Sequence, residues 1–344
     1  MIKRLLPLIL AILTLCSCSS AYKKEDPAPK RTTVLSDAQQ PDEQEKQLPA
    51  PTDSQPDAEF CAALCSYLPV GSAPDLSEEY LPLIKQLDYL ILNTGVYWNE
   101  EGNLEISPEL DSCCNRLKGV TDLWCTVNPQ GELIRSDTAG ASIDTPEERA
   151  VLVQNIVSFA TEYKLSGIDI DWEFPLPEEW EDFSALLSEL KQGLGEISLS
   201  VALYPNRSAL SEQAVEAIDR VHIMAYDQFD QNGFHSTMQT AADALNSFVA
   251  LGFSPSDLSL GIPAYGRPTD ASAQWIFYRD IDPQTCDPQN PNLCGNVFFN
   301  SPQLAEQKAE YVKKNGFGGV MVYHLLCDRT DELSLIEEVK NTIS

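Results

Sequence analysis

Three carboxylates alternate with apolar residues in one run of the sequence, residues 167–175, which reads GIDIDWEFP. In a β-strand successive side chains point to opposite faces, so Asp169, Asp171 and Glu173 would share one face at a spacing of about 7 Å. Like charges held this close raise the cost of ionising one another, and a purely structural strand gains nothing from them. We therefore interpret the row as a functional site in which the ionisation of carboxyl groups is controlled.

The alternative interpretation is an exposed edge strand with one polar face. The preceding sequence argues against it, because residues 150–163 carry apolar side chains at helical spacing and a short turn ending in Gly167 joins this helix to the strand. A buried helix-to-strand unit places the three carboxylates in an interior rather than at an edge.

Eight apolar runs alternate with segments of helical spacing between residue 60 and the end of the 344-residue chain. The runs are 60–68, 89–96, 121–127, 167–174, 197–203, 221–226, 258–262 and 319–325, and the helical segments include 76–87, 146–163, 178–194, 211–218, 241–251, 302–314 and 333–343. This order predicts an α/β fold, a (β/α)8 TIM barrel over residues 60–344. An open parallel sheet is the alternative.

In such a barrel the carboxyl ends of the strands meet at one mouth, where active sites lie. Glu173 ends the fourth run, Tyr226 and Asp227 end the sixth, and Arg267 follows the seventh. We find no glycine-rich phosphate loop after the first strand and no serine or cysteine nucleophile signature. The chemistry predicted at the mouth is therefore that of carboxylates.

Four motifs in this order resemble glycoside hydrolase family 18, the chitinase-like family. They are Ser166-Gly167-Ile168-Asp169-Ile170-Asp171-Trp172-Glu173, Met224-Ala225-Tyr226-Asp227, Leu260-Gly261-Ile262-Pro263-Ala264-Tyr265-Gly266-Arg267 and Gly318-Gly319-Val320-Met321-Val322-Tyr323. The resemblance extends over most of residues 60–344.

The resemblance implies a retaining hydrolysis in which the substrate assists, an exception among glycosidases. Glu173 would protonate the glycosidic oxygen and then act as the base toward water. Asp171 would orient the 2-acetamido group of the substrate, Asp169 would tune Asp171 through a shared proton, and Tyr226 would bind the acetamido oxygen. A raised pKa of Glu173 is expected from a like-charged neighbour and burial.

The implied substrate is a β-1,4-linked N-acetylglucosamine glycan such as chitin or chito-oligosaccharides. The residues expected to bind it are Asp227, Met224, Arg267, Tyr265 and Tyr323, with Tyr67 and Trp98 as aromatic platforms beside Trp124 and Trp275. Two alternatives remain open: an endo-β-N-acetylglucosaminidase acting on N-linked glycans, and a chitinase-like lectin without catalysis. No cofactor is implied.

The chain departs from the family pattern at several places. Ser166 replaces the first aspartate of the signature, and Tyr323 replaces the tryptophan that usually floors the reacting-sugar subsite. The third run lacks the family's Ser-x-Gly-Gly element. The spacing between Arg267 and Gly318 is too short for the α+β insertion domain of many members, so we expect a barrel without it.

The N-terminus predicts export. Residues 1–18 resemble a bacterial lipoprotein signal peptide, in which Lys3 and Arg4 precede an apolar stretch and Cys18 is the lipidated residue. An ordinary secretory signal is the alternative. Residues 19–59 are polar and proline-rich, as expected of a disordered tether to the membrane. The absence of an acidic residue directly after Cys18 favours the outer membrane or the cell surface.

Charge and cysteine content add two further expectations. A net charge of −29 argues against nucleic acid and other anionic polymers as partners, whereas a neutral glycan is not repelled. Export permits disulfides, and Cys286 with Cys294 is the best candidate pair. No spacing matches a zinc site with histidine, so we expect no metal.

Overall fold

The structure is a computed structural model that describes residues 62–129, 142–173, 175–205, 208–270, 272 and 274–344. The predicted signal peptide, Cys18 and the tether of residues 19–59 lie outside the described residues, as do Cys61 and Phe174. Among the described residues, no helix combines the length and apolar character needed to cross a bilayer. Lipid anchoring thus stays a prediction.

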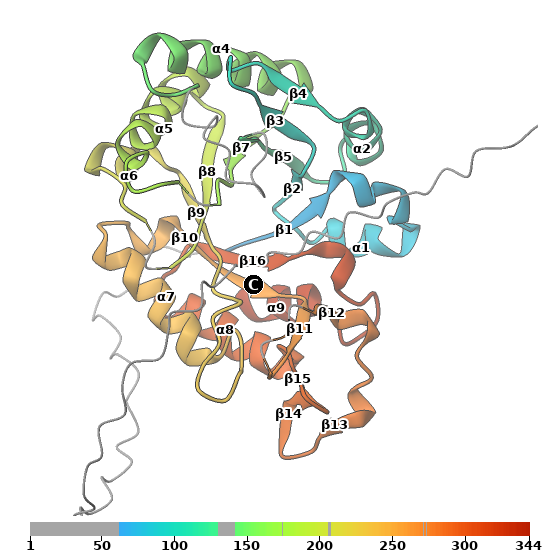
Figure 1. Cartoon of the computed structure of the whole chain (residues 1–344). Coiled ribbons are helices and arrows are strands. Elements are labelled where there is room, and N and C mark those ends of the chain that lie inside the picture. The colour runs from blue at the N-terminus through green and yellow to red at the C-terminus, as the bar shows by residue number, and fades with distance from the viewer. Residues whose placement is uncertain (1–61, 130–141, 174, 206–207, 271, 273) are drawn as a thin grey trace, which may run out of the picture. The chain divides into compact units, whose positions relative to one another are not determined.

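Eight parallel strands close into a barrel, which confirms the predicted fold and excludes the open sheet (Figure 1). The strands are β1 (Ala63–Pro69), β2 (Tyr89–Asn93), β5 (Asp122–Thr126), β7 (Gly167–Ile170), β8 (Ser198–Leu203), β9 (Arg220–Ile223), β10 (Leu258–Pro263) and β16 (Gly319–Tyr323). Their order around the barrel is β1-β16-β10-β9-β8-β7-β5-β2. Each strand falls within, or within one residue of, a predicted apolar run.

Helices surround the strands (Figure 1). They are α1 (Leu81–Ile84), α2 (Glu109–Leu117), α4 (Pro146–Tyr163), α5 (Trp180–Leu194), α6 (Glu212–Ala217), α7 (Met238–Ala250), α8 (Pro302–Lys314) and α9 (Leu335–Ile343). Helices α4 and α8 begin and end at the predicted residues. Each starts with a proline directly after a capping residue, Thr145 or Ser301, whose side chain accepts a backbone N–H.

Two helices differ from the prediction. The helix predicted over residues 76–87 is reduced to the single turn α1 after a 3₁₀ turn, because Pro82 has no N–H to donate and a continuous helix through it would lose a hydrogen bond. Helix α2 was not among the predicted segments. Its buried residues Leu110, Cys113 and Leu117 follow helical spacing after Pro108, so a signal was present.

The barrel strands separate two buried layers. Alternate residues such as Leu64, Leu90 and Val201 face the helices and form the larger apolar cluster. Their neighbours, among them Tyr67, Tyr89 and Trp124, form a second, aromatic cluster. Two-residue alternation along every strand places this second cluster inside the barrel.

Small sheets accompany the barrel. Strands β3 (Val96–Trp98), β4 (Leu104–Ile106) and β6 (Asn128–Pro129) form one, in the order β4-β3-β6. Strands β11 (Tyr265–Pro268), β12 (Ile276–Phe277), β13 (Cys286–Asp287), β14 (Asn290–Cys294) and β15 (Val297–Phe298) form the other, in the order β12-β11-β15-β14-β13.

The five-stranded sheet lies between β10 and α8 in the sequence. This is the segment that we predicted to be too short for an α+β insertion domain. The described residues of this segment contain no α-helix, so that expectation holds, but the sheet itself was not predicted. The β13–β14 pair carries a disulfide between Cys286 and Cys294, which confirms the predicted pairing. Cys65, Cys113, Cys114, Cys125 and Cys327 are free thiols.

The Trp124 indole leaves no room for a side chain at Gly167, the first residue of β7. A Cβ atom at this position would lie 2.2 Å from Cδ2 of the Trp124 indole, which is buried inside the barrel. We predict that Gly167→Ala lowers the free energy of unfolding by about 3 kcal/mol, the upper part of the range for overpacking. Urea denaturation measures this loss. Gly71→Ala is the control, because a Cβ there meets no atom within 4 Å, and an equal effect of the two substitutions would contradict the prediction.

Candidate active site

Asp169 lies inside the barrel and is completely buried. Oδ2 accepts hydrogen bonds from the hydroxyl of Tyr67 and from Thr126, each at 3.0 Å. Oδ1 accepts one from Ser200 at 2.6 Å and lies 3.2 Å from Nδ1 of His222. These four partners come from four different strands, β1, β5, β8 and β9, so the predicted position of Asp169 deep in the site is confirmed.

His222 is the central residue that the sequence analysis missed. Its ring is buried, with Nδ1 facing Asp169 and Tyr67, and Nε2 lying 3.0 Å from the hydroxyl of Tyr89. Since Tyr67 donates to Asp169, we assign the Nδ1 proton to a bond with the carboxylate and make Nε2 the acceptor from Tyr89. A signal existed: His222 is a lone polar residue between Val221 and Ile223 in an apolar run, as is Ser200 in the preceding strand.

Two predicted sugar platforms are wrong. Tyr67 is 1% exposed and its hydroxyl is used by Asp169, so it supports the carboxylate instead of contacting a ligand. Trp98 is also 1% exposed and packs edge-on against Trp172 at 6.1 Å between ring centroids. Trp124, stacked on Tyr89 at 4.1 Å, fills the barrel interior. Trp98 and Trp124 thus pack in the core, although each lies on a strand where a sugar platform was expected.

Asp171 and Glu173 follow β7 where the strand leaves the barrel, and both are half-buried. The backbone N–H of Asp171 donates to Oδ1 of Asn128, at 3.2 Å, so Asn128 holds the chain just beyond the strand. Asn128 directly follows the third run, which lacks the family's Ser-x-Gly-Gly element, and the hydroxyl of Thr126 in that run donates to Asp169. That run supports the carboxylate row with different residues.

The pKa of Glu173 is raised from its ordinary value of 4.5 to about 7. Burial is the larger cause, and the carboxylate of Asp227 is the second. The sequence predicted the direction, but the like-charged neighbour is Asp227 after β9. A carboxyl group that is half protonated near neutral pH can act as a general acid and then as a base.

Asp227 is held by residues of β11 and of its own loop. Oδ1 accepts a hydrogen bond from Nη1 of Arg267 at 2.7 Å, and Oδ2 accepts one from the hydroxyl of Tyr265 at 2.9 Å. Nδ1 of His235 lies 3.5 Å from Oδ1. The predicted grouping of Asp227 with Arg267 is confirmed. Tyr265 is completely buried, so it positions Asp227 and the prediction that it contacts substrate is wrong.

Four aromatic rings gather between these carboxylates and the five-stranded sheet. Tyr226 lies 5.8 Å from Tyr323 at the end of β16, with the planes 29° apart. Trp275 stacks on Tyr265 at 3.9 Å and meets Tyr323 edge-on at 6.2 Å. Trp275 and Tyr323 are half-buried and thus retain exposed ring surface. The smaller ring of Tyr323 is thus accompanied by the indole of Trp275, which directly precedes β12.

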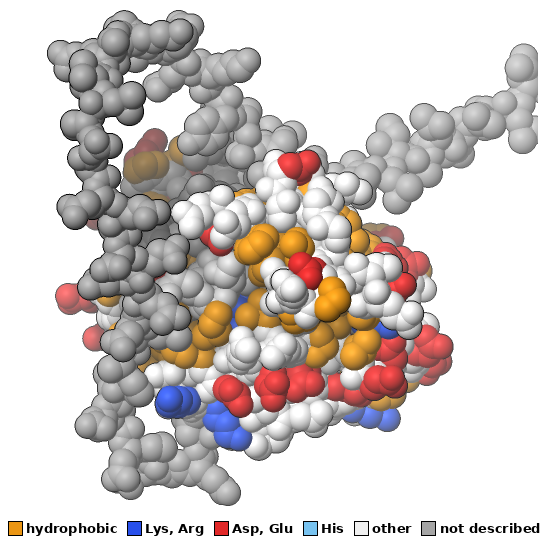
Figure 2. Space-filling model, turned by 90° about the horizontal axis from the view of Figure 1, so that it is seen from below, with side chains coloured by type: hydrophobic (Ala, Val, Ile, Leu, Met, Phe, Trp, Pro, Cys, Tyr) orange, Lys and Arg blue, Asp and Glu red, His pale blue; other side chains and the backbone are white. Residues whose placement is uncertain are grey.

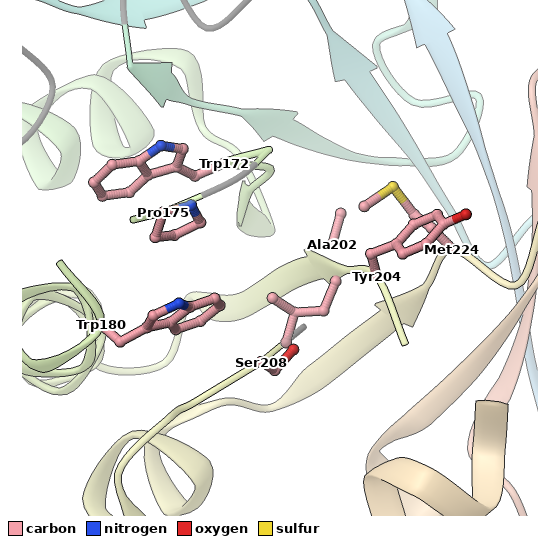
Figure 3. Close-up of a pocket in the computed structure, with 8 residues that line it drawn as sticks. Trp172, Pro175, Trp180, Ala202, Tyr204, Ser208 and Met224 are labelled. Carbon is pink, nitrogen blue, oxygen red and sulfur yellow. The ribbon is translucent and has the colours of Figure 1, made fainter. Parts of the chain in front are cut away.

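Met224, predicted to bind substrate, is buried in the same interior cluster as Tyr226. It lines a small hollow of about 10 Å³ with Trp172, Pro175, Trp180 and Tyr204. Figure 3 shows Trp172, Pro175 and Trp180 on one side of this hollow, and Tyr204 and Met224 on the other. That volume is far below the roughly 300–1,000 Å³ of typical ligand pockets, so the hollow itself does not hold a sugar ring.

The described residues contain no group of three or more His, Cys, Asp or Glu side chains arranged to hold a metal ion. The described side chains can carry out proton transfer at Glu173, and a second carboxylate, Asp171, lies two residues before it in the chain.

Comparison with known proteins decides the family. The family model described as Glycosyl hydrolases family 18 matches residues 118–328, more than half of the chain. The chain belongs to glycosyl hydrolase family 18. The match includes the row from Asp169 to Glu173, Asp227, Arg267 and Tyr323.

Relatives in family 18 are distant. A probable chitinase 2 of Drosophila melanogaster is 29% identical over 142 residues, which are 35% of this chain and 29% of that protein, so the match spans less than a third of the curated relative. The structure of the GH18 chitinase ChiB of Flavobacterium johnsoniae superposes with a TM-score of 0.70 at 23% identity, covering 83% of this chain and 94% of that one. The structure of a class V chitinase of Nicotiana tobaccum in complex with NAG4 superposes with a TM-score of 0.69 at 18% identity, covering 82% of this chain and 99% of that one.

The charge of Asp227 provides a test of the electrostatics in this family 18 site. Asp227→Asn keeps the side chain's shape and removes the charge that opposes ionisation of Glu173, so the pKa of Glu173 should fall. Because the acid must be protonated, we predict that the alkaline limb of the kcat/KM profile moves about 1 pH unit lower. Asp243→Asn, an exposed change on α7, is the control. A limb that stays in place or rises in Asp227→Asn would contradict the assigned cause.

Proposed function

We propose that this protein hydrolyses β-1,4-linked N-acetylglucosamine glycans of the chitin class, with Glu173 as the general acid and base. The observation that carries the proposal is the carboxyl group of Glu173, whose pKa is raised to about 7 at the carboxyl end of β7 in a family 18 barrel. An acid poised near neutral pH is what cleavage of a glycosidic bond requires.

The reaction we propose has two steps. The Glu173 carboxylic acid donates its proton to the glycosidic oxygen, while the acetamido oxygen of the substrate attacks the anomeric carbon and the leaving sugar departs. The Glu173 carboxylate then takes a proton from water, which attacks the same carbon, reopens the ring formed by the acetamido group and leaves the configuration retained. Asp171 would orient the acetamido group, and Tyr226 would hydrogen-bond its oxygen.

The surroundings of Glu173 support a neutral, carbohydrate substrate. The half-buried rings of Trp275 and Tyr323 offer apolar surface of the kind on which sugar faces stack. The charge of the molecule as a whole also bears on the substrate: the face in Figure 2 carries a row of Asp and Glu side chains, with Lys and Arg near its ends. Together with a net charge of −29, this acidity repels anionic polymers and leaves a neutral glycan unaffected.

The test is hydrolysis of fluorogenic N-acetylchito-oligosaccharides beside a high-mannose glycoprotein. We expect wild type to turn over the oligosaccharides. Glu173→Gln, which cannot donate a proton and later accept one, should lose at least about 10²-fold in kcat while still binding them. Glu178→Gln, an exposed change a few residues along the chain, should behave as wild type.

Other results would overturn the proposal. Turnover of the glycoprotein alone would make the protein an endo-β-N-acetylglucosaminidase. Binding by wild type with no turnover of either substrate would make it a lectin. Full activity in Glu173→Gln would remove Glu173 from the mechanism.

We also propose that the protein is exported and lipid-anchored through Cys18 at the outer membrane or the cell surface. The disulfide between Cys286 and Cys294 supports export, since such bonds persist in oxidising compartments. Cys18→Ser should release the protein from the membrane fraction, and mass spectrometry should find an acylated Cys18 in wild type only. Unchanged fractionation of the variant would contradict the anchor.

A further inference from the structure

A lysine on α8 is buried without a carboxylate partner. Lys308 is completely buried, and Nζ donates to the carbonyl oxygen of Ser236 at 2.8 Å, to its Oγ at 2.9 Å and to Oδ1 of Asn300 at 2.6 Å. Among the ion pairs of the described residues, none includes Lys308. Burying an unpaired ammonium is costly, and accordingly burial lowers its pKa to about 7. A more stable core would place an apolar residue here.

Two of the three hydrogen bonds of Lys308 reach Ser236, at one end of the loop between β9 and α7. Ser236 has φ of +62°, a left-handed conformation that is unfavourable for a residue with a side chain, and the next residue, Thr237, caps α7. Asp227, near the other end of the loop, has φ of +57°. Two strained positions thus bracket the loop, and such positions persist only when their surroundings hold them.

His235 connects the two ends. It directly precedes Ser236, is completely buried, and places Nδ1 3.5 Å from Oδ1 of Asp227. Its ring lies 5.4 Å from that of Tyr265, whose hydroxyl donates to Asp227. A backbone bridge between Phe229 and His235 closes the loop across its middle. Movement of Ser236 would therefore displace His235, and with it a wall of the Asp227 site.

We propose that Lys308 is a positioning residue of the active site: its amino group fixes Ser236 and, through His235, holds Asp227 in place against Arg267 and Tyr265. This inference rests on the proposed function, because its kinetic readout is the ionisation of Glu173. The charged and titratable groups that face Asp227 are Arg267 and Tyr265 of β11, His235 of its own loop, Tyr226 before it, and Glu173 after β7. Asp227 is the one charge that raises the pKa of Glu173, so Lys308 acts through it and not by its own field.

The experiment compares Lys308→Met, which keeps the length of the side chain and removes the charge, with Lys314→Met at an exposed position of the same helix. In Lys308→Met we expect the alkaline limb of kcat/KM to move at least about 0.5 pH unit lower, as Asp227 shifts away from Glu173. In an Asp227→Asn background the same substitution should leave the alkaline limb unmoved, because the Asp227 charge through which Lys308 acts on Glu173 is already absent. Lys314→Met should match wild type in both backgrounds.

Several outcomes overturn the inference. One is an unmoved limb in Lys308→Met, even if its melting temperature falls, because that result would mean a purely structural role. Another is an equal shift with and without the Asp227 charge. If Lys308→Met fails to fold, Ser236→Ala removes one of the three acceptors and should give a smaller shift in the same direction, and an unmoved limb there also overturns it.

Failure of the proposed function is recognised separately. If wild type hydrolyses no glycan, the proposed function fails. Backbone amide hydrogen exchange then tests, without any activity, whether Lys308 fixes the loop between β9 and α7. We expect faster exchange confined to residues 224–237 in Lys308→Met relative to Lys314→Met. Equal exchange in the two variants would overturn the role of Lys308.

Discussion

One buried carboxyl group links most of the barrel strands around the site. Asp169 has no access to solvent, and a carboxyl group in that position is tolerated only when its oxygens are hydrogen-bonded. Its partners stand on β1, β5, β8 and β9, so satisfying Asp169 fixes the relative heights of four strands around β7. The ends of β7 and β9 carry Asp171, Glu173 and Asp227, and those ends are positioned as a result.

Sequence patterns predicted the parts of the molecule that depend on local periodicity. The eight barrel strands follow from apolar runs that alternate with amphipathic helices, and α4 and α8 follow from their capping residues and prolines. Motif order placed Glu173, Asp227 and Arg267 at one mouth. The pair Cys286 and Cys294 was predicted because a short polar loop joins them, and they face each other across β13 and β14.

Features set by contacts between distant residues were not predicted. Lys308 contacts Ser236, and the neighbouring His235 lies against Asp227, but no spacing in the sequence indicates either contact. Tyr67 and Trp98 were assigned to sugar binding because an aromatic ring near a strand end fits a platform and a core equally well until burial is known. The five-stranded sheet was missed because its strands are two to five residues long, too short for a periodic pattern.

Glu173 is the carboxyl group whose ionisation is opposed both by burial and by the charge of Asp227, so it holds a proton near neutral pH. The most direct test is a ¹³C NMR titration of the Glu173 carboxyl carbon, with Glu173→Gln used to identify its signal. A midpoint at about pH 7 is predicted. A midpoint at the ordinary value of 4.5 would mean that Glu173 is ionised at neutral pH and would contradict its role as the acid.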